Sequence, residues 1–352
     1  MRLTGTRLRG VVGSRGPLEG AGRIKVHALG VTGHVTLRDQ VRSIEAAGLD
    51  GFFVTDHLFV SHGKPRREAV SGGDPFVRLA MAGALSDRLM LGSSVVNLGL
   101  AHPALAVRSF IELAALFGGG RVLAGIGAGW NREEFEALGL DFPAFERRMD
   151  RLAEAAAMAR ALFHEGFADL DGTYVVAREL ALGPAPSPAP RLLLGGGSDR
   201  LLEIAGRYAD IVDLNASSRR LKLGGSQPVF RDAVRRLTTT AADLEDSVQR
   251  LRASAAAAAR DPDSIELSIL VNAVRFCSEN EIESVEVDLC TQMGIDRQSL
   301  ADCPYVFVGT PERMRAQLTE HAQRLGLRHL ILAPADADVL ARFRQDVVAA
   351  ID

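Results

Sequence analysis

The chain has 352 residues, of which 47% are hydrophobic and 24% charged, and these proportions exclude disordered and collagen-like proteins. A chain of this length can bury enough surface to fold without disulfides or a structural metal. Its three cysteines form no C-x-x-C pair, so neither a disulfide framework nor a cysteine-rich zinc site is expected. The net charge of −3 gives no basic field for DNA or RNA, and nucleic acids are therefore excluded as expected partners.

The first 22 residues are rich in Arg and Gly and lack the apolar run of a secretion signal. We expect them to form a flexible leader on a cytoplasmic protein. The longest uncharged stretch runs from Leu89 to Val107, but it contains Asn97, His102 and Pro103. It is better explained as a strand, a loop and the start of a helix than as a membrane span, so no membrane association is expected.

From Arg23 onward, short β-rich apolar runs alternate with amphipathic helical segments about eight times. Several of these runs are continuously hydrophobic, as strands buried on both faces should be. The predicted strands are Lys25–Leu29, Gly51–Thr55, Met90–Val96, Val122–Ile126, Arg191–Leu194, Asp210–Leu214, Glu266–Val271 and Arg328–Leu332. Eight β/α units in about 330 residues predict an α/β fold, a single-domain TIM barrel spanning 23–352.

Helix boundaries are marked in the sequence as well. Thr36 is placed to cap a helix that ends near Gly48, and Thr310 precedes a first-turn proline. Apolar residues at spacings of three and four predict a helix from Phe145 to Ala159. Three insertions interrupt the pattern, near 164–190, 216–228 and 277–305, and we expect them to form loops that shape the site.

Asp56 and His57 follow the second predicted strand. Catalytic groups of barrel enzymes lie at the carboxyl ends of the strands, so this pair is expected to position a cofactor or transfer a proton. The alternative is an aspartate that caps backbone amides beside a packed histidine. A zinc site using these two residues and His62 is disfavoured because their spacing fits no zinc motif, and we expect no metal.

Three small-residue segments at the ends of later strands are candidates for ligand binding. The segment that ends the third strand, around Ser93, Ser94 and Val95, would let a flat ring approach the backbone, although a plain buried strand is an alternative. A glycine-rich segment ends the fourth strand: Gly127, Ala128, Gly129, Trp130 and Asn131. Trp130 takes the place of the third glycine of a G-x-G-x-x-G fingerprint, so a Rossmann site is excluded. We expect an opened backbone with an aromatic wall, or a tight turn with a core tryptophan.

The third of these segments, Gly195, Gly196, Gly197 and Ser198, joins the fifth strand to a helix. Backbone amides at a helix N-terminus attract anions, so a phosphate site is expected here, although glycine-rich turns are common. Asp199 in the first turn stabilises the helix but disfavours an anion.

Five segments in this order resemble the luciferase-like monooxygenase superfamily, and within it the branch that uses the deazaflavin coenzyme F420. They cover the chain from about Arg23 to the C-terminus and are GFFVTDHLF from Gly51, RLMLGSSV from Arg88, GAGWNREEF from Gly127, LGGGS from Leu194 and VGTPE from Val308. The resemblance implies a TIM barrel with the cofactor ring in its mouth, held by the residues of the four segments above. It also implies a non-prolyl cis peptide at Ser94–Val95 and a homodimer.

By this resemblance, Asp56 and His57 contact the cofactor or the substrate, and His57 is expected to move a proton. Trp130 falls where the family's sugar-phosphate dehydrogenases carry a glutamate, which argues against that substrate class. We expect hydride transfer between F420 and a small organic molecule such as an activated alkene, imine, alcohol or carbonyl. Two alternatives are an FMN-dependent two-component monooxygenase on the same fold and a flavin-binding protein that has lost its chemistry.

Overall fold

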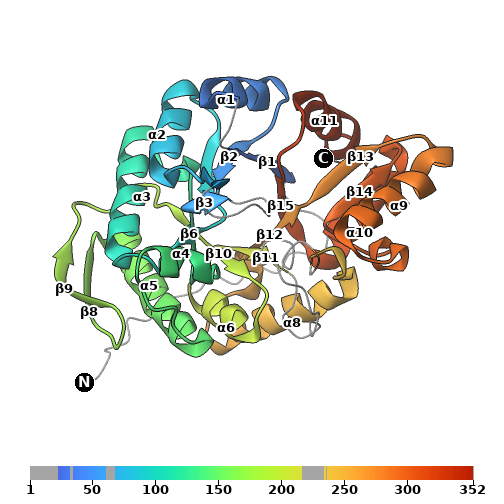
Figure 1. The fold of residues 1–352 in the computed structure, drawn as a ribbon. Coiled ribbons are helices and arrows are strands. Elements are labelled where there is room, and N and C mark those ends of the chain that lie inside the picture. Colours follow the sequence, from blue (N-terminus) through green and yellow to red (C-terminus); the bar gives the residue numbers. More distant parts are fainter. Residues whose placement is uncertain (1–22, 32–34, 61–67, 216–233, 235, 352) are drawn as a thin grey trace.

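The computed structural model describes residues 23–31, 35–60, 68–215, 234 and 236–351. Within them, eight parallel strands close into a barrel surrounded by helices, which confirms the predicted TIM barrel (Figure 1). Each strand pairs with the next one along the chain, and the last pairs with the first. The barrel strands are β1 (Lys25–Leu29), β2 (Gly51–Val54), β5 (Met90–Ser93), β7 (Val122–Gly127), β10 (Arg191–Gly196), β11 (Ile211–Leu214), β12 (Glu266–Val271) and β15 (Leu327–Leu332).

One predicted strand was wrong in its extent. The run from Met90 to Val96 was expected to be continuous, but β5 ends at Ser93. The chain then bulges and resumes as the short β6 (Val96–Asn97), which pairs with β7. The apolar character of the run conceals this interruption, because a buried bulge needs the same side chains as a buried strand.

Helices cover the outside of the barrel, and their caps follow the sequence. Thr36 accepts a hydrogen bond from the amide of Asp39, and Gly48 adopts the left-handed conformation after the first helix. The outer helices are α1 (Leu37–Ala46), α2 (Pro75–Leu85), α3 (Pro103–Phe117), α5 (Phe145–Glu165), α6 (Asp199–Tyr208), α8 (Ala241–Ala257), α10 (Pro311–Leu325) and α11 (Ala337–Arg342). The short turns are η2 (Gly119–Arg121), η4 (Pro262–Ser264) and η7 (Phe343–Val348). None of the described helices is long and apolar enough to cross a bilayer.

The insertions contain more regular structure than loops. After α5, β8 (Phe167–Asp171) and β9 (Val176–Ala181) form an antiparallel hairpin. Between β12 and α10 the chain forms a βαβ unit of β13 (Ala273–Phe276), α9 (Ile282–Met293) and the parallel β14 (Val306–Gly309), with η5 (Glu279–Glu281) and η6 (Arg297–Leu300). The predicted leader 1–22 and the insertion 216–228 lie outside the described residues.

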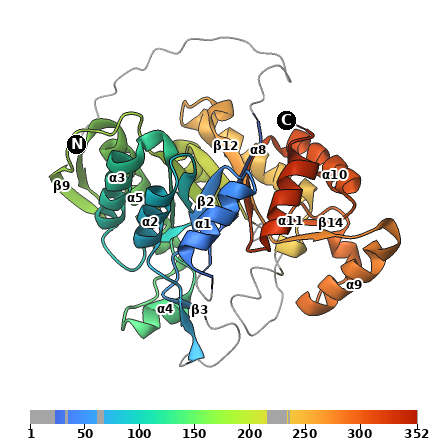
Figure 2. The ribbon, with the colours of Figure 1, turned by 90° about the horizontal axis from the view of Figure 1, so that it is seen from above.

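Two further elements mark one end of the barrel. The hairpin of β3 (Phe59–Val60) and β4 (Val70–Ser71) follows β2, and α4 (Arg132–Ala137) follows β7. Both project from the same end in Figure 2. Because they follow strands directly, this end is the carboxyl end of the barrel, where TIM-barrel sites lie.

The barrel interior has its own apolar layer. It is formed by one buried side chain from each of five strands: Phe53, Leu123, Leu193, Ile211 and Ile331. These residues pack apart from the larger core between strands and helices. The layer fills the middle of the barrel, so any ligand must lie above it, at the carboxyl end.

Below this layer a buried polar chain lies near the amino ends of the strands. His27 Nε2 is 2.9 Å from Nδ1 of His329, whose Nε2 is 2.6 Å from Oε2 of Glu266. Burial lowers the pKa of both imidazoles. Although burial favours the neutral acid, hydrogen bonds from His329 and Arg191 hold the pKa of Glu266 well below its usual range. The carboxylate therefore accepts from His329, and His329 accepts from His27.

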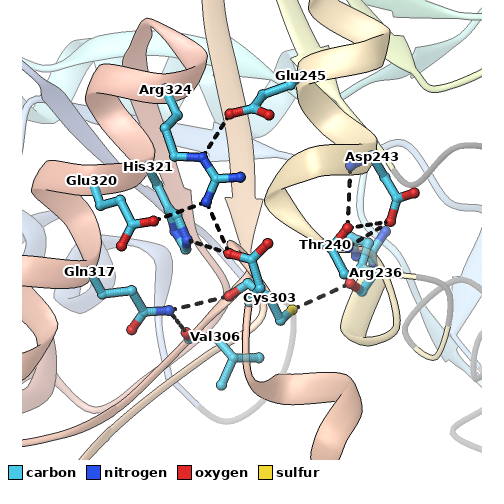
Figure 3. A network of polar contacts seen from close by, with 11 residues as sticks. Arg236, Thr240, Asp243, Glu245, Cys303, Val306, Gln317, Glu320, His321 and Arg324 are labelled. Carbon is cyan, nitrogen blue, oxygen red and sulfur yellow. Dashed lines mark hydrogen bonds and ion pairs between the residues drawn. The ribbon is translucent and has the colours of Figure 1, made fainter.

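A second polar network fastens the βαβ unit to the barrel (Figure 3). Arg324 on α10 donates to Glu245 on α8 and to Glu320 on its own helix. Gln317 donates to the backbone oxygens of Cys303 and Val306, at the start of β14. These contacts fix the end of the unit against two outer helices, on the side of the barrel.

Candidate functional site

The Ser94–Val95 peptide bond is cis, which confirms the expectation drawn from the resemblance. Val95 follows the end of β5 and lies in the barrel mouth between two glycines. A Cβ atom added at Gly127 would lie 2.5 Å from Cγ2 of Val95, and one added at Gly195 would lie 3.0 Å from its Cγ1. The two glycines therefore leave the space that the Val95 side chain fills, and the bulge forms a small apolar platform at the mouth.

Asp213 on β11 lies against this platform. Its Oδ2 accepts a hydrogen bond of 2.8 Å from the hydroxyl of Ser94, and the residue is 3% exposed. Oδ1 is buried and has no hydrogen-bond partner. Burial raises the pKa of Asp213, although the Ser94 and Ser268 hydroxyls partly oppose the shift. A carboxyl group that is harder to ionise than usual thus faces the bulge.

Asp56 follows β2 and contacts the same bulged segment from the other side. Its Oδ2 accepts from the backbone amide of Asn97 at 2.9 Å. Burial raises the pKa of Asp56, and this effect outweighs the hydrogen bond from Asn97 and the attraction of His57. Asp56 and Asp213 therefore both bond to the chain around Val95, one at a backbone amide and the other at a hydroxyl.

His57 is held by a residue that the sequence analysis did not select. Its Nδ1 lies 2.9 Å from Oε1 of Glu134, and the same carboxylate oxygen accepts from the amide of Leu58 at 3.1 Å. Glu134 is 1% exposed. Trp130 contacts the imidazole edge to face, with the ring centroids 5.5 Å apart, and restricts its movement on another side. Nδ1 is thus engaged, and Nε2 is the nitrogen left for a substrate.

The glycine-rich segment after β7 forms a turn. Gly129 has a φ of 74° and lies so close to Asn97 that a Cβ would come within 2.3 Å of its side-chain oxygen. Trp130 follows and is 41% exposed, so it is not a core residue. Asn131 caps α4 by accepting from the amide of Glu133. The turn therefore brings Trp130 and Glu134 to His57 from one short stretch of chain.

The segment after β10 leads into α6 as predicted. Ser198 caps the helix by accepting from the amide of Leu201. Gly196 has a φ of 151°, and a Cβ there would lie 2.8 Å from the Leu201 side chain. Asp199 is paired with Arg250 at 3.0 Å, which offsets part of its negative charge. The predicted phosphate site at this helix start stays a prediction.

Other predicted site residues have structural partners. The Ser93 hydroxyl is fully buried and donates to the carbonyl of Gly125 at 2.8 Å, so it joins β5 to β7. Ala128 and Gly197 lie in the two glycine-rich turns. Within the described ranges, no three His, Cys, Asp or Glu side chains come together as a metal site, and His62 lies outside those ranges.

The sequence analysis missed Glu134, Asn97 and Asp213 as functional candidates. Asp213 did carry a signal, because it is an acid inside an apolar strand run. Glu134 did not, because an acid in the first turn of a helix is ordinary. Asn97 contacts Asp56 through its backbone amide, and a pattern of side chains does not reveal such a contact.

The sequence model of the luciferase-like monooxygenase family matches residues 27–223, which is more than half of the chain. The chain belongs to the luciferase-like monooxygenase family. It is 27% identical over 329 residues to the F420-dependent glucose-6-phosphate dehydrogenase of Beutenbergia cavernae, covering 86% of this chain and 89% of that one.

Solved structures of the luciferase-like fold are similar throughout. An F420-dependent secondary alcohol dehydrogenase, in complex with an F420–acetone adduct, matches with a TM-score of 0.72 and 16% identity, covering 94% of this chain and all (100%) of that chain. A long-chain alkane monooxygenase matches with a TM-score of 0.69 and 14% identity, covering 94% and 91%. At these identities the likeness shows the shared barrel, which occurs with both chemistries.

Proposed function

We propose that this chain is an oxidoreductase that uses coenzyme F420 to transfer a hydride to or from a small organic molecule. The observation that carries the proposal is the Val95 platform together with His57, which follows the Asp56 that binds the amide of Asn97. The curated relatives of the chain include F420-dependent dehydrogenases. We infer a substrate such as an activated alkene, imine, alcohol or carbonyl. We also propose a cytoplasmic homodimer.

The residues of the mouth fit such a coenzyme. Val95 offers an apolar surface for a flat ring, and the unpartnered Oδ1 of Asp213 offers a hydrogen-bonding group beside it. Asp56, the Gly127–Asn131 turn and the Gly195–Ser198 turn surround the platform, and the start of α6 suits a phosphate group. The coenzyme, when bound, supplies the carbon that gives or accepts the hydride.

The chain's own residues orient the imidazole of His57 and move a proton. Glu134 holds Nδ1 of His57, so the imidazole cannot turn freely and exchanges a proton with the substrate through Nε2. Trp130 contacts the imidazole edge to face, and we propose that its indole lines the substrate pocket. Because an indole replaces the expected glutamate, we propose a substrate other than a sugar phosphate, although several relatives are named for glucose 6-phosphate.

Equilibrium titration with oxidised and reduced F420 and with FMN tests the proposal, followed by an oxygen-electrode measurement during turnover. We expect tight binding of F420 and turnover without oxygen consumption. Preferential binding of FMN with oxygen consumption would identify a monooxygenase instead. Failure to bind either compound would leave a protein that keeps the barrel and has lost its chemistry.

A further inference from the structure

A cavity of about 330 Å³ lies behind the glycine-rich turn that carries Trp130. It is lined by the first half of α5, the segments after β6 and β7 and the tip of the β8–β9 hairpin. Figure 1 shows this hairpin beside α5. Its lining residues are Leu98, Gly99, Ala128, Phe135, Pro143, Arg147, Arg148, Arg151, Leu152, Thr173 and Tyr174. Three arginines line this cavity and no acid does.

The three guanidinium groups have aromatic or backbone partners. Arg148 donates to the carbonyls of Gly129 and Pro143 and stacks on Phe142, with 4.4 Å to the ring centroid. Arg151 donates to two backbone oxygens after β6. The Arg147 guanidinium lies 5.5 Å from the ring centroid of Tyr174. None of these partners carries a negative charge, so the cavity keeps its positive charge.

The acids of α5 nearest to these arginines have partners of their own or are exposed, and none of them lines the cavity. Asp150 pairs with Arg200 on α6 at 2.8 Å. Glu154 accepts from three successive amides at the hairpin tip, at 2.9, 2.7 and 2.7 Å. Glu146 is exposed in the first turn and does not line the cavity. Burial and, to a lesser extent, a neighbouring arginine lower the pKa of Arg148 and of Arg151.

The cavity is one turn of chain away from the candidate site. Trp130 of the turn contacts His57, whereas the carbonyl of the preceding Gly129 accepts from Arg148. Asn97, whose amide bonds to Asp56, also accepts from the amide of Gly99 in the cavity wall. The cavity wall and the candidate site therefore share the Gly127–Asn131 turn and the segment after β6.

We propose that this arginine-lined cavity is an anion subsite that binds a phosphate or carboxylate group belonging to a ligand of the barrel mouth. Guanidinium groups recognise both anions through paired N–H donors, and the partly buried setting strengthens the attraction. Two ligands could supply the group: the acidic tail of the coenzyme or an anionic substrate. Assignment to the tail rests on the proposed function, whereas anion binding itself does not.

Arg147 is the best position to test. Its guanidinium lies against the Tyr174 ring, whereas Arg148 and Arg151 donate to backbone carbonyls that hold loops in place. Calorimetric titration of the full chain with inorganic pyrophosphate at low salt should show binding. Arg147→Gln should weaken that binding about tenfold, as expected for the loss of one charge-assisted contact. Arg147→Lys should keep part of it.

Arg108→Gln is the matched control, because Arg108 is an exposed arginine on α3 that does not line the cavity. Failure of the parent chain to bind pyrophosphate, or equal affinities in the Arg147→Gln and Arg108→Gln variants, would overturn the subsite. Neither readout needs F420, so the subsite can be judged even if the proposed function fails.

The source of the anion is decided by a second titration. If the coenzyme tail occupies the cavity, saturation with F420 abolishes pyrophosphate binding there. Arg147→Gln then weakens F420 about tenfold but leaves unchanged the affinity for the deazaflavin riboside that lacks the phosphate and glutamates. If an anionic substrate occupies it, the F420-loaded chain still binds pyrophosphate, and Arg147→Gln leaves F420 affinity unchanged. Both results support an anion subsite.

Discussion

His57 and Glu134 are joined by a bond of 2.9 Å between Nδ1 and a carboxylate oxygen that is almost completely buried. His57 lies in the loop after β2 and Glu134 lies in α4, which follows β7, so the pairing depends on the closed barrel. A histidine oriented in this way presents Nε2, whereas a freely rotating one would present either nitrogen.

Removing either partner should lower turnover. His57→Ala should reduce kcat by about a hundredfold or more, the usual scale for a general acid or base, and Glu134→Gln by about tenfold because the imidazole remains but is less well oriented. Steady-state kinetics with reduced F420 measure both. Glu133→Gln, one residue away on α4, is the control, and equal turnover in the two glutamine variants would contradict the role of Glu134.

Trp130→Ala should change substrate use more than stability. A core tryptophan typically costs about 3 to 5 kcal/mol when truncated, but Trp130 is 41% exposed and should cost far less. We expect a nearly unchanged melting temperature and an altered KM. Trp130 is also the only tryptophan, so its fluorescence should respond to the cofactor. A large loss of stability without any fluorescence response would place it in the core.

Asp213→Asn should stabilise the protein at neutral pH. Burial raises the pKa of Asp213 in the folded state, so the folded chain loses stability relative to the unfolded chain as the pH rises above about 3.9. Asparagine does not ionise, and its side-chain oxygen can still accept the hydrogen bond from the Ser94 hydroxyl. The stability gain over the parent, measured by urea unfolding between pH 4 and 8, should grow with pH and then level off. A gain that does not depend on pH would show that the carboxyl group is not shifted.

The buried histidine pair should make the protein sensitive to acid. Burial lowers the pKa of His27, so its contribution to stability is complete above about 6.5, the unfolded value, and is lost as the pH falls below it. His27→Gln should flatten this acid limb by up to about 1.4 kcal/mol per pH unit. His164→Gln, at an exposed position in the last turn of α5, should leave the limb unchanged.

The predicted phosphate site at α6 can be tested by removing a charge. Asp199→Asn should tighten binding of F420 several-fold, because a carboxylate in the first turn opposes an anion there. The deazaflavin riboside without phosphate should bind equally to both chains. This variant is preferable to a substitution at Gly196, whose positive φ and contact with Leu201 would disturb folding. Unchanged F420 affinity would place the phosphate elsewhere.

The sequence alone predicts the barrel because each strand and helix carries its own local signal. The strands β1 and β12 have the predicted bounds, and Thr36 and Ser198 cap helices as expected. A glycine inside this strand pattern indicated a possible bulge, and the family resemblance placed it at Ser94–Val95.

The local sequence pattern could not predict side-chain contacts between residues that follow different strands of the barrel. Glu134 lies 77 residues from His57, and Asp213 lies 119 residues from Ser94. Such pairs depend on the register of strands that are distant along the chain. The βαβ unit was missed for another reason. In α9 an apolar residue, Val287, is exposed and an acid, Glu286, is buried, so the sequence does not mark the buried face clearly.

The placement of Val95 between Gly127 and Gly195 makes three distant positions depend on one another during sequence divergence. A side chain at either glycine would collide with Val95, so a homologue that carries alanine there needs a smaller residue at 95. Gly127→Ala alone should therefore be deleterious, whereas Gly127→Ala combined with Val95→Ala should be tolerated. A substitution at either glycine is therefore tolerated only after residue 95 has become smaller, so its effect depends on the sequence in which it arises.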